Sequence, residues 1–254
     1  MRAPGAVVDA LVVTRRNLLR YVRVPTLLMF STIQPVMLLL LFTYVFGGAI
    51  RLPPGLEYID FVMPGILVQT AVFGSVQTGI GLAEDLSKGV IDRFRSLPMA
   101  RSAVLAGRTT SDSIRNLFVV SLMLGVGFLL GFRFHAGLAP AIAAIGLVLL
   151  FGHAFQWISA LIGLAVQDVE ATQAAGFVWI FPLVFASSAF VPVETMPDWM
   201  RWFAGRNPVS VTVDALRALT LGGPTSTHMW QALAWMAVIL ALFVPLAIRR
   251  YRRL

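Results

Sequence analysis

Six long apolar stretches constrain the fold of this chain more than any other feature. Each is about 20 residues or longer, the length that a helix needs to cross a hydrocarbon core of roughly 30 Å. Only 13% of the 254 residues are charged, whereas soluble domains carry roughly 25%. The stretches cover residues 26–47, 60–82, 109–131, 138–166, 171–190 and 228–248. We therefore expect an all-α integral membrane protein with six transmembrane helices.

The placement of the basic residues predicts the orientation of these spans. Of the twenty Lys and Arg residues, fifteen lie before the first span, between Lys88 and Arg115 at the start of the third span, or in the C-terminal tail. An excess of Lys and Arg marks the cytoplasmic side of a membrane. Both termini are therefore predicted to be cytoplasmic. Because the basic residues flank apolar spans, the net charge of +8 does not indicate nucleic-acid binding.

Residues 1–24 form a basic segment ahead of the first span. Five arginines stand against one acid, Asp9, and Val8, Leu11 and Val12 contribute to an apolar side. The order of residues differs from that of a cleaved signal peptide. We expect an amphipathic helix that lies on the membrane surface; a disordered basic tail is the alternative.

Residues 83–101, between the second and third spans, are predicted to form a cytoplasmic helix. Glu84 and Asp85 precede the basic residues, an order that suits the helix macrodipole, and Pro98 is expected to end the helix. Four apolar residues are spaced to share one face: Leu86, Val90, Phe94 and Leu97. Such a helix lies on lipid headgroups or enters a groove of a soluble partner, and the spacing alone leaves both open.

Residues 191–223 are too polar to span a membrane and too apolar for a loose loop. After Pro197, the aromatic residues Trp199 and Trp202 are spaced to share a helix face. Asn207 and Pro208 are typical of an N-cap and a first helical residue. We predict an external re-entrant helical hairpin with its aromatic residues at headgroup depth.

The sequence contains no recognisable active site. The three histidines are scattered, and there is no cysteine. The only lysine, Lys88, lacks the preceding glycine of a P-loop. We therefore expect no catalytic residue, no metal site and no cofactor bound by this chain. The acidic residues lie near predicted span ends, where Asp112 and Arg115 are spaced to pair on one helix face.

A few polar residues lie inside the predicted spans and are candidates for a substrate pathway. They are Gln34, Gln69, Gln77, His153 and Gln156. Hydrogen bonding between helices is the alternative role for each of them. As a set they favour a large, mostly apolar cargo over an inorganic ion.

Several short motifs occur in a characteristic order. They are Phe61-Val62-Met63-Pro64-Gly65-Ile66-Leu67, Asp92-Arg93-Phe94-Arg95-Ser96-Leu97-Pro98-Met99, Phe190-Val191-Pro192 with Met196-Pro197, and Asn207-Pro208 with Arg217. Over nearly its whole length the chain resembles the membrane subunit of ABC-2 type transporters, in the daunorubicin/doxorubicin-resistance exporter permease group.

This resemblance implies a role for each segment. Residues 83–101 would be the coupling helix, and 1–24 the connecting helix on the membrane surface. The contact with a separate ATPase subunit would involve Glu84, Asp85, Leu86, Val90, Phe94 and Arg95. Two cytosolic ABC ATPase subunits, which bind ATP and Mg, would drive two permease subunits, either two copies of this chain or this chain and a paralogue.

The resemblance also implies that the complex exports a hydrophobic or amphipathic drug or lipid across the bacterial inner membrane, in contact with membrane lipid. Two alternatives remain from the residues alone. The first is a secondary transporter or channel that works without an ATPase, and the second is a membrane anchor for another protein.

Overall fold

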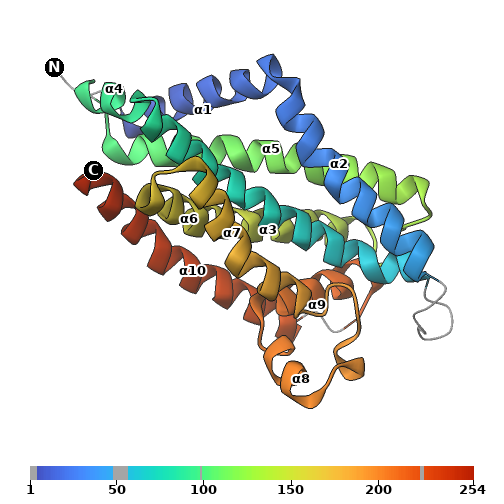
Figure 1. Cartoon of the computed structure of the whole chain (residues 1–254). Coiled ribbons are helices and arrows are strands. Elements are labelled where there is room, and N and C mark those ends of the chain that lie inside the picture. Colours follow the sequence, from blue (N-terminus) through green and yellow to red (C-terminus); the bar gives the residue numbers. More distant parts are fainter. Residues whose placement is uncertain (1–4, 48–56, 98, 224–225) are drawn as a thin grey trace.

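The computed structural model describes residues 5–47, 57–97, 99–223 and 226–254, and all regular structure in these ranges is helical (Figure 1). The helices are α1 (Ala6–Arg23), α2 (Pro25–Leu41), the π-helix η1 (Phe42–Phe46), α3 (Tyr58–Ser87), α4 (Val90–Ser96), α5 (Arg101–Leu129), α6 (Leu138–Val166), α7 (Val169–Phe185), the 3-10 turn η2 (Val193–Thr195), α8 (Asp198–Ala204), α9 (Pro208–Leu221) and α10 (Ser226–Arg253). The all-α prediction is confirmed.

Four of these helices, α3, α5, α6 and α10, are long and apolar enough to cross a membrane. The other two predicted spans correspond to shorter apolar helices, Ser31–Phe46 and Val169–Phe185. The predicted span 171–190 is shortened because the helix ends at Phe185 and the next residues turn back into the bundle, where Ala189 packs against Gly65 of α3. The multi-pass architecture holds, whereas six full-length spans remain a prediction.

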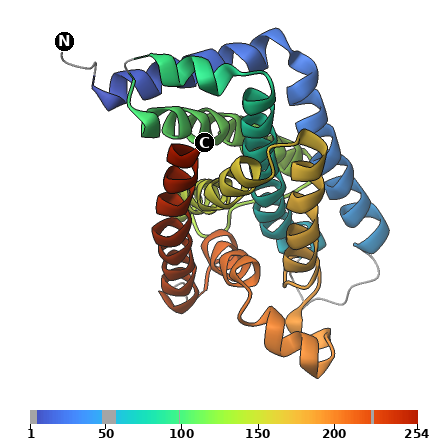
Figure 2. The ribbon, with the colours of Figure 1, turned by 60° about the vertical axis from the view of Figure 1, so that its left-hand side comes forward.

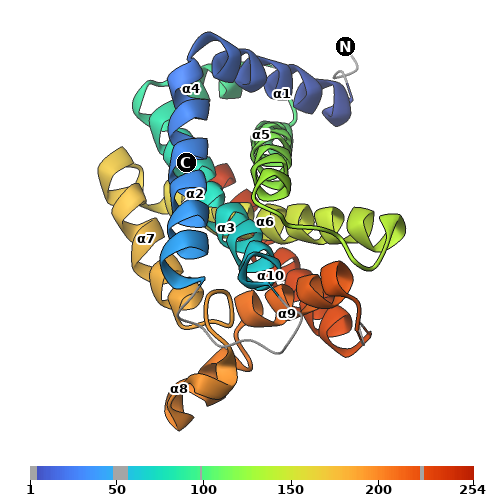
Figure 3. The same cartoon turned by 90° about the vertical axis from the view of Figure 1, so that its right-hand side faces the viewer.

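Helix α3 is the centre of the bundle, with α5, α6, α7 and α9 packed around it (Figure 3). Its closest neighbour is α6, and glycines make that approach possible. A Cβ on Gly163 of α6 would overlap the backbone of Gly79 of α3. The main hydrophobic core surrounds this crossing.

Helix α1 lies across one end of the bundle, the end that also carries α4 and the C-terminus (Figures 1 and 2). Its inward face is mostly small and polar, and Thr14 donates a hydrogen bond to the carbonyl of Gly107 in α5. Its apolar side chains Val8, Leu11 and Val12 are exposed. The structure confirms the helix predicted for this segment rather than a disordered tail.

The predicted continuous helix over 83–101 is divided in the structure. Helix α3 continues to Ser87, and α4 begins at Val90. Between them, Gly89 adopts the left-handed conformation with φ of 65°, which glycine reaches without steric cost. Glu84, Asp85 and Leu86 are therefore part of α3, and Pro98, the expected helix stop, lies outside the described residues.

The predicted hairpin over 191–223 also differs from expectation. Its second helix, α9, begins at Pro208 behind the Asn207 cap, as predicted. Most of this helix is buried against α3, α6 and α10, so it is not an exposed arm of a hairpin. Only α8 projects from the bundle, at the end opposite to α1 (Figure 1).

Candidate transport cavity and its ion network

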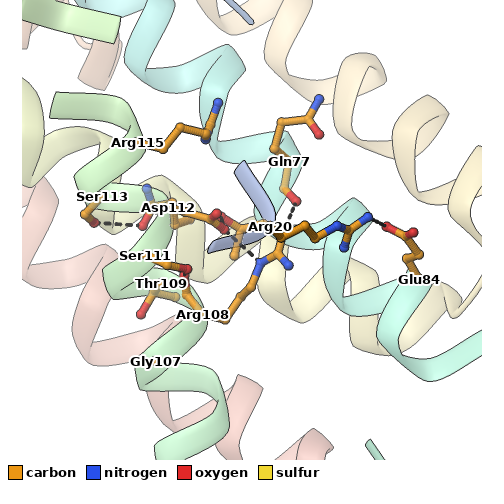
Figure 4. A network of polar contacts seen from close by, with 12 residues as sticks. Arg20, Gln77, Glu84, Gly107, Arg108, Thr109, Ser111, Asp112, Ser113 and Arg115 are labelled. Atoms are coloured by element: carbon orange, nitrogen blue, oxygen red, sulfur yellow. Dashed lines mark hydrogen bonds and ion pairs between the residues drawn. The ribbon is translucent and has the colours of Figure 1, made fainter. Parts of the chain in front are cut away.

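A buried carboxylate, Asp112 of α5, joins three helices (Figure 4). Its Oδ2 accepts hydrogen bonds from Arg108 Nε at 3.0 Å and from Thr78 Oγ1 of α3 at 2.7 Å. Its Oδ1 accepts from the hydroxyl of Tyr21 of α1 at 2.5 Å. Asp112 and Arg108 are 0% and 6% exposed. Because charged groups this deeply buried must be paired to be tolerated, the network fixes α1, α3 and α5 relative to one another.

Arg115, predicted to be able to pair with Asp112, interacts with it electrostatically but makes no direct ion pair with it. Residues four before and three after Asp112 are both its neighbours on a helix, and Arg108 makes the ion pair. Arg115 instead donates from Nη2 to the carbonyl of Gly74 in α3 at 2.7 Å. Its guanidinium carbon lies 5.8 Å from the ring centre of Tyr21.

Tyr21 keeps its proton in this environment. Burial raises the pKa of its hydroxyl above the ordinary value, and the neighbouring charge of Asp112 raises this pKa further. The hydroxyl is therefore a hydrogen-bond donor over the physiological pH range, so α1 is tied to Asp112 at any working pH.

Further ion pairs tie α1 to the end of α3. Arg20 and Lys88 both donate to Glu84, at 2.5 and 2.6 Å, and Arg16 donates to Asp85 at 3.1 Å. Two of the residues predicted to contact an ATPase, Glu84 and Asp85, thus bind side chains of their own chain.

The apolar stripe predicted for the coupling helix also faces the bundle. Leu86 and Phe94 pack against a smaller hydrophobic cluster, separate from the main core, which includes Ile91. The guanidinium carbon of Arg16 lies 5.2 Å from the ring centre of Phe94. Val90 is half-buried, and the side chain of Arg95 lies outside the described part of the structure. At the end of α4, by contrast, Leu97 is 51% exposed.

A cavity of about 900 Å³ lies between α2 and the group formed by α1, α3, α5 and α7. Its apolar wall includes Ile33, Met37, Leu38, Phe73, Val119 and Phe177. Its polar lining includes Asn17, Arg20, Gln34, Gln69, Gln77 and Arg115. Three of the predicted pathway residues, Gln34, Gln69 and Gln77, therefore come together in one cavity.

The other two predicted pathway residues are held elsewhere. Ser113 of α5 contacts His153 Nδ1 at 3.0 Å and donates to Gln156 Oε1 at 3.1 Å, while Trp157 Nε1 donates to His153 Nε2 at 3.2 Å. With Nε2 as an acceptor, the neutral Nδ1–H tautomer fits this network. Both side chains join α5 to α6, and neither lines the cavity.

The residues singled out in the external segment have two different surroundings. Trp199 and Trp202 of α8 are 72% and 64% exposed, and Pro197 caps that helix. Asn207 caps α9 through Val209 N, and its Nδ2 donates to the carbonyls of Leu183 and Ala186 at the end of α7. Pro208 is the first residue of α9.

Nearby, Arg217 of α9 connects the same end of the bundle. It donates to the carbonyls of Phe61, Ser188 and Ala189 and pairs with Asp214 at 3.1 Å. Arg217 therefore stabilises the packing of α9 on α3. Among the described residues, no group of His, Cys, Asp and Glu is placed to hold a metal ion.

Sequence reasoning missed the network around Asp112 and with it the polar end of the cavity. The available signal was the spacing of Arg108 and Asp112, four residues apart at the entrance of a span. Nothing in the sequence indicated that Tyr21, 91 residues away, would complete the network.

Comparison with known proteins points to one family. The family model described as ABC-2 type transporter matches residues 9–221. The daunorubicin resistance ABC transporter permease protein DrrB1 of Streptomyces coeruleorubidus is 35% identical over 237 residues, covering 93% of this chain and 83% of the relative. The probable doxorubicin resistance ABC transporter permease protein DrrC of Mycobacterium tuberculosis is 30% identical, covering 99% of this chain and 94% of the relative. The doxorubicin resistance permease protein DrrB of the same species is 28% identical over 75% of this chain and 69% of the relative.

Proposed function

From the premise that this chain belongs to the ABC-2 type transporter family, we propose that it exports a hydrophobic or amphipathic compound, a drug or a lipid. As an ABC permease subunit it does not itself hydrolyse ATP. Two cytosolic ATPase subunits bind ATP and Mg, and a second permease subunit, a copy or a paralogue, completes the path. The membrane is the bacterial inner membrane, and the resistance named for the relatives is the basis for a drug as cargo.

The end that carries α1, α4 and the C-terminus is the cytoplasmic end. Arg249, Arg250, Arg252 and Arg253 of the tail lie there with the arginines of α1, in agreement with the positive-inside rule. In this orientation the exposed valines and leucine of α1 face lipid headgroups, and α8 places Trp199 and Trp202 at the outer interface, where aromatic side chains are favoured.

Helix α4 is the contact for the ATPase in this proposal, and the residues packed around α4 indicate how it acts. Phe94 anchors α4 on the bundle beside Leu86 at the end of α3, and Leu97 after α4 is the exposed apolar side chain that a partner groove can bury. Glu84 and Asp85 contribute to coupling indirectly, because their ion pairs tie the end of α3 to α1. Movement of α4 is thereby transmitted to two helices that line the cavity.

The cavity is the observation that carries the proposal. Its volume of about 900 Å³ suits a drug-sized molecule, its wall is mainly apolar, and it extends to Tyr21 and Arg108 of the ion network that joins α1, α3 and α5. Ile33 and Met37 on its edge are 45% and 64% exposed on α2. A cargo dissolved in the bilayer therefore has a route into the cavity from the side.

The first test is purification of the tagged chain from native membranes in mild detergent, with identification of co-purified proteins by mass spectrometry. The expected result is a near-stoichiometric soluble protein that contains a P-loop, with or without a paralogous permease. Recovery of this chain alone, under conditions that preserve a known ABC complex, would instead indicate an ATPase-independent transporter.

The coupling contact is tested by Leu97→Ala in the co-purified complex. Removal of this exposed side chain should lower cargo-stimulated ATP hydrolysis several-fold without loss of membrane insertion. Leu138→Ala is the matched control, because Leu138 is 78% exposed at the start of α6, where no ATPase contact is proposed. Equal activity of the two variants would exclude Leu97 from the contact.

A further inference from the structure

Arg115 is a buried cation of the cavity that has no ion pair of its own within the described residues, because it shares the carboxylate of Asp112 with Arg108. Arg115 is 4% exposed and lies on the cavity lining. Arg108 is paired with Asp112, and Arg20 with Glu84, whereas no ion pair is found for Arg115 in the described ranges. Two buried guanidinium groups that share one carboxylate leave an excess positive charge, which is disfavoured without a further anion. An ionisable residue inside a membrane bundle indicates a functional site.

Hydrogen-bond donors of the same cavity also lack partners. Arg115 Nε and Asn17 Nδ2 are buried atoms without a hydrogen-bond partner in the part of the chain that the structure describes. Both residues line the cavity and are 4% exposed. Buried polar groups are nearly always satisfied. Unused donors beside an excess positive charge therefore match a group that offers acceptor oxygens and one negative charge.

The rest of the cavity is suited to an apolar chain. Met37, Leu38 and Leu41 of α2 face Val119 of α5 and Phe177 of α7 across it. The cavity therefore joins a polar, positively charged region to an apolar one that reaches the outer surface of α2. An amphiphile has the same two parts, a polar head group and an apolar body. The positive charge of the polar region indicates that the head group is negatively charged.

We propose that the cavity binds an anionic amphiphile, with a phosphate or carboxylate head group on Arg115 and Asn17 and an apolar body along α2. The acceptor Gln69 Oε1, which is also buried without a partner among the described residues, suits a hydroxyl of the same molecule. This inference rests on the proposed export function, because it names the charge class of the cargo.

The test compares amphiphiles that differ only in the charge of the head group. The chain with its co-purified partners is placed in phosphatidylcholine nanodiscs, and binding of dodecyl phosphate, dodecanol and dodecylamine is measured calorimetrically against empty nanodiscs. Dodecyl phosphate should bind at least about tenfold more tightly than the other two, the ratio expected from one charge-assisted contact. Equal binding of all three overturns the proposal, as does equally tight binding of inorganic phosphate, which indicates a site for a free anion.

Variants locate the effect. Arg115→Gln should weaken dodecyl phosphate binding about tenfold and Arg115→Lys much less, while Arg249→Gln, which removes the same charge from the exposed tail, should leave it unchanged. Equal losses in Arg115→Gln and Arg249→Gln would show nonspecific attraction and refute the proposal. Ile33→Trp, at the exposed edge of the cavity, should weaken binding at least fivefold even if Arg115→Gln fails to fold, and unchanged affinity in that variant contradicts the assignment.

These results are separable from those for the proposed function. A complex that contains a P-loop partner but binds the three amphiphiles alike loses only the anionic assignment. If the chain binds dodecyl phosphate selectively but no ATPase co-purifies with it, the anionic site is supported and the ATP-driven mechanism is refuted.

Discussion

Replacement of Asp112 by Asn tests how much the buried network contributes to the fold. The substitution is nearly isosteric, so it removes the negative charge without opening a cavity. Arg108 is then left buried, close to Arg115, with no carboxylate at hydrogen-bond distance among the described residues. Removal of one partner from a buried ion pair costs about 3–5 kcal/mol, and we expect a loss of about 4 kcal/mol in the free energy of unfolding.

The measurement is reversible unfolding by SDS in mixed micelles, followed by the fluorescence of the six tryptophans. Asp214→Asn is the matched control: Asp214 also pairs with an arginine on its own helix at 3.1 Å, but its side chain is 32% exposed. Partly exposed pairs contribute up to about 1 kcal/mol. The double variant Arg108→Met with Asp112→Asn should recover part of the loss, because the unpaired cation of Arg108 is gone.

Two outcomes would refute this reasoning. One is a loss in Asp112→Asn no larger than that in Asp214→Asn. The other is simple addition of the two single losses in the double variant, since additivity means that Arg108 and Asp112 do not interact.

Three further predictions concern the packing of α1 and of α3. Tyr21→Phe should cost about 1.5–3 kcal/mol, the contribution of a hydrogen bond to a charged group. Because burial raises the pKa of Tyr21 in the folded protein, this contribution is complete below about pH 10, the ordinary pKa of tyrosine, and declines progressively as the pH rises from there toward the raised pKa. Unfolding titrations should therefore show a steeper alkaline loss in the wild type than in Tyr21→Phe. Gly163→Ala should cost about 1–3 kcal/mol by overpacking against α3, measured by the same SDS unfolding, whereas Gly146→Ala on α6, where a Cβ meets open space, should not destabilise. Arg20→Glu should lower export by repelling Glu84, and addition of Glu84→Arg should restore part of it, as measured in vesicles; no recovery would mean that the pair does not connect α1 to α3.

The sequence predicts the helices better than it predicts their interior contacts, for physical reasons. Apolar length is a local property, so the long spans are visible in it, and the Asn207-Pro208 cap is set by adjacent residues. The break at Gly89 is harder to foresee, because a glycine is tolerated within a helix as well as at its end. The direction of Leu86 and Phe94 cannot be read from spacing alone, because spacing defines a face and does not say whether the bundle or a partner covers it.

The candidate site shows the same limit. Gln34, Gln69 and Gln77 could be predicted as a polar set, since amides are uncommon in spans. Their meeting in one cavity, apart from His153 and Gln156, depends on the order in which helices pack around α3, and this information is distributed over the whole chain.

The burial of α3 has a consequence for the biogenesis of the protein. In its most apolar stretch 89% of the residues are buried, with a mean hydropathy of 1.6, whereas the corresponding stretch of α10 is 22% buried with a mean hydropathy of 2.2. The finished helix is thus solvated by protein rather than by lipid, but it leaves the ribosome before α5, α6, α7 and α9 exist. During that interval Gln69, Ser75 and Thr78 have no neighbours from those helices, so α3 is the segment whose membrane insertion depends most on assistance until the later helices arrive.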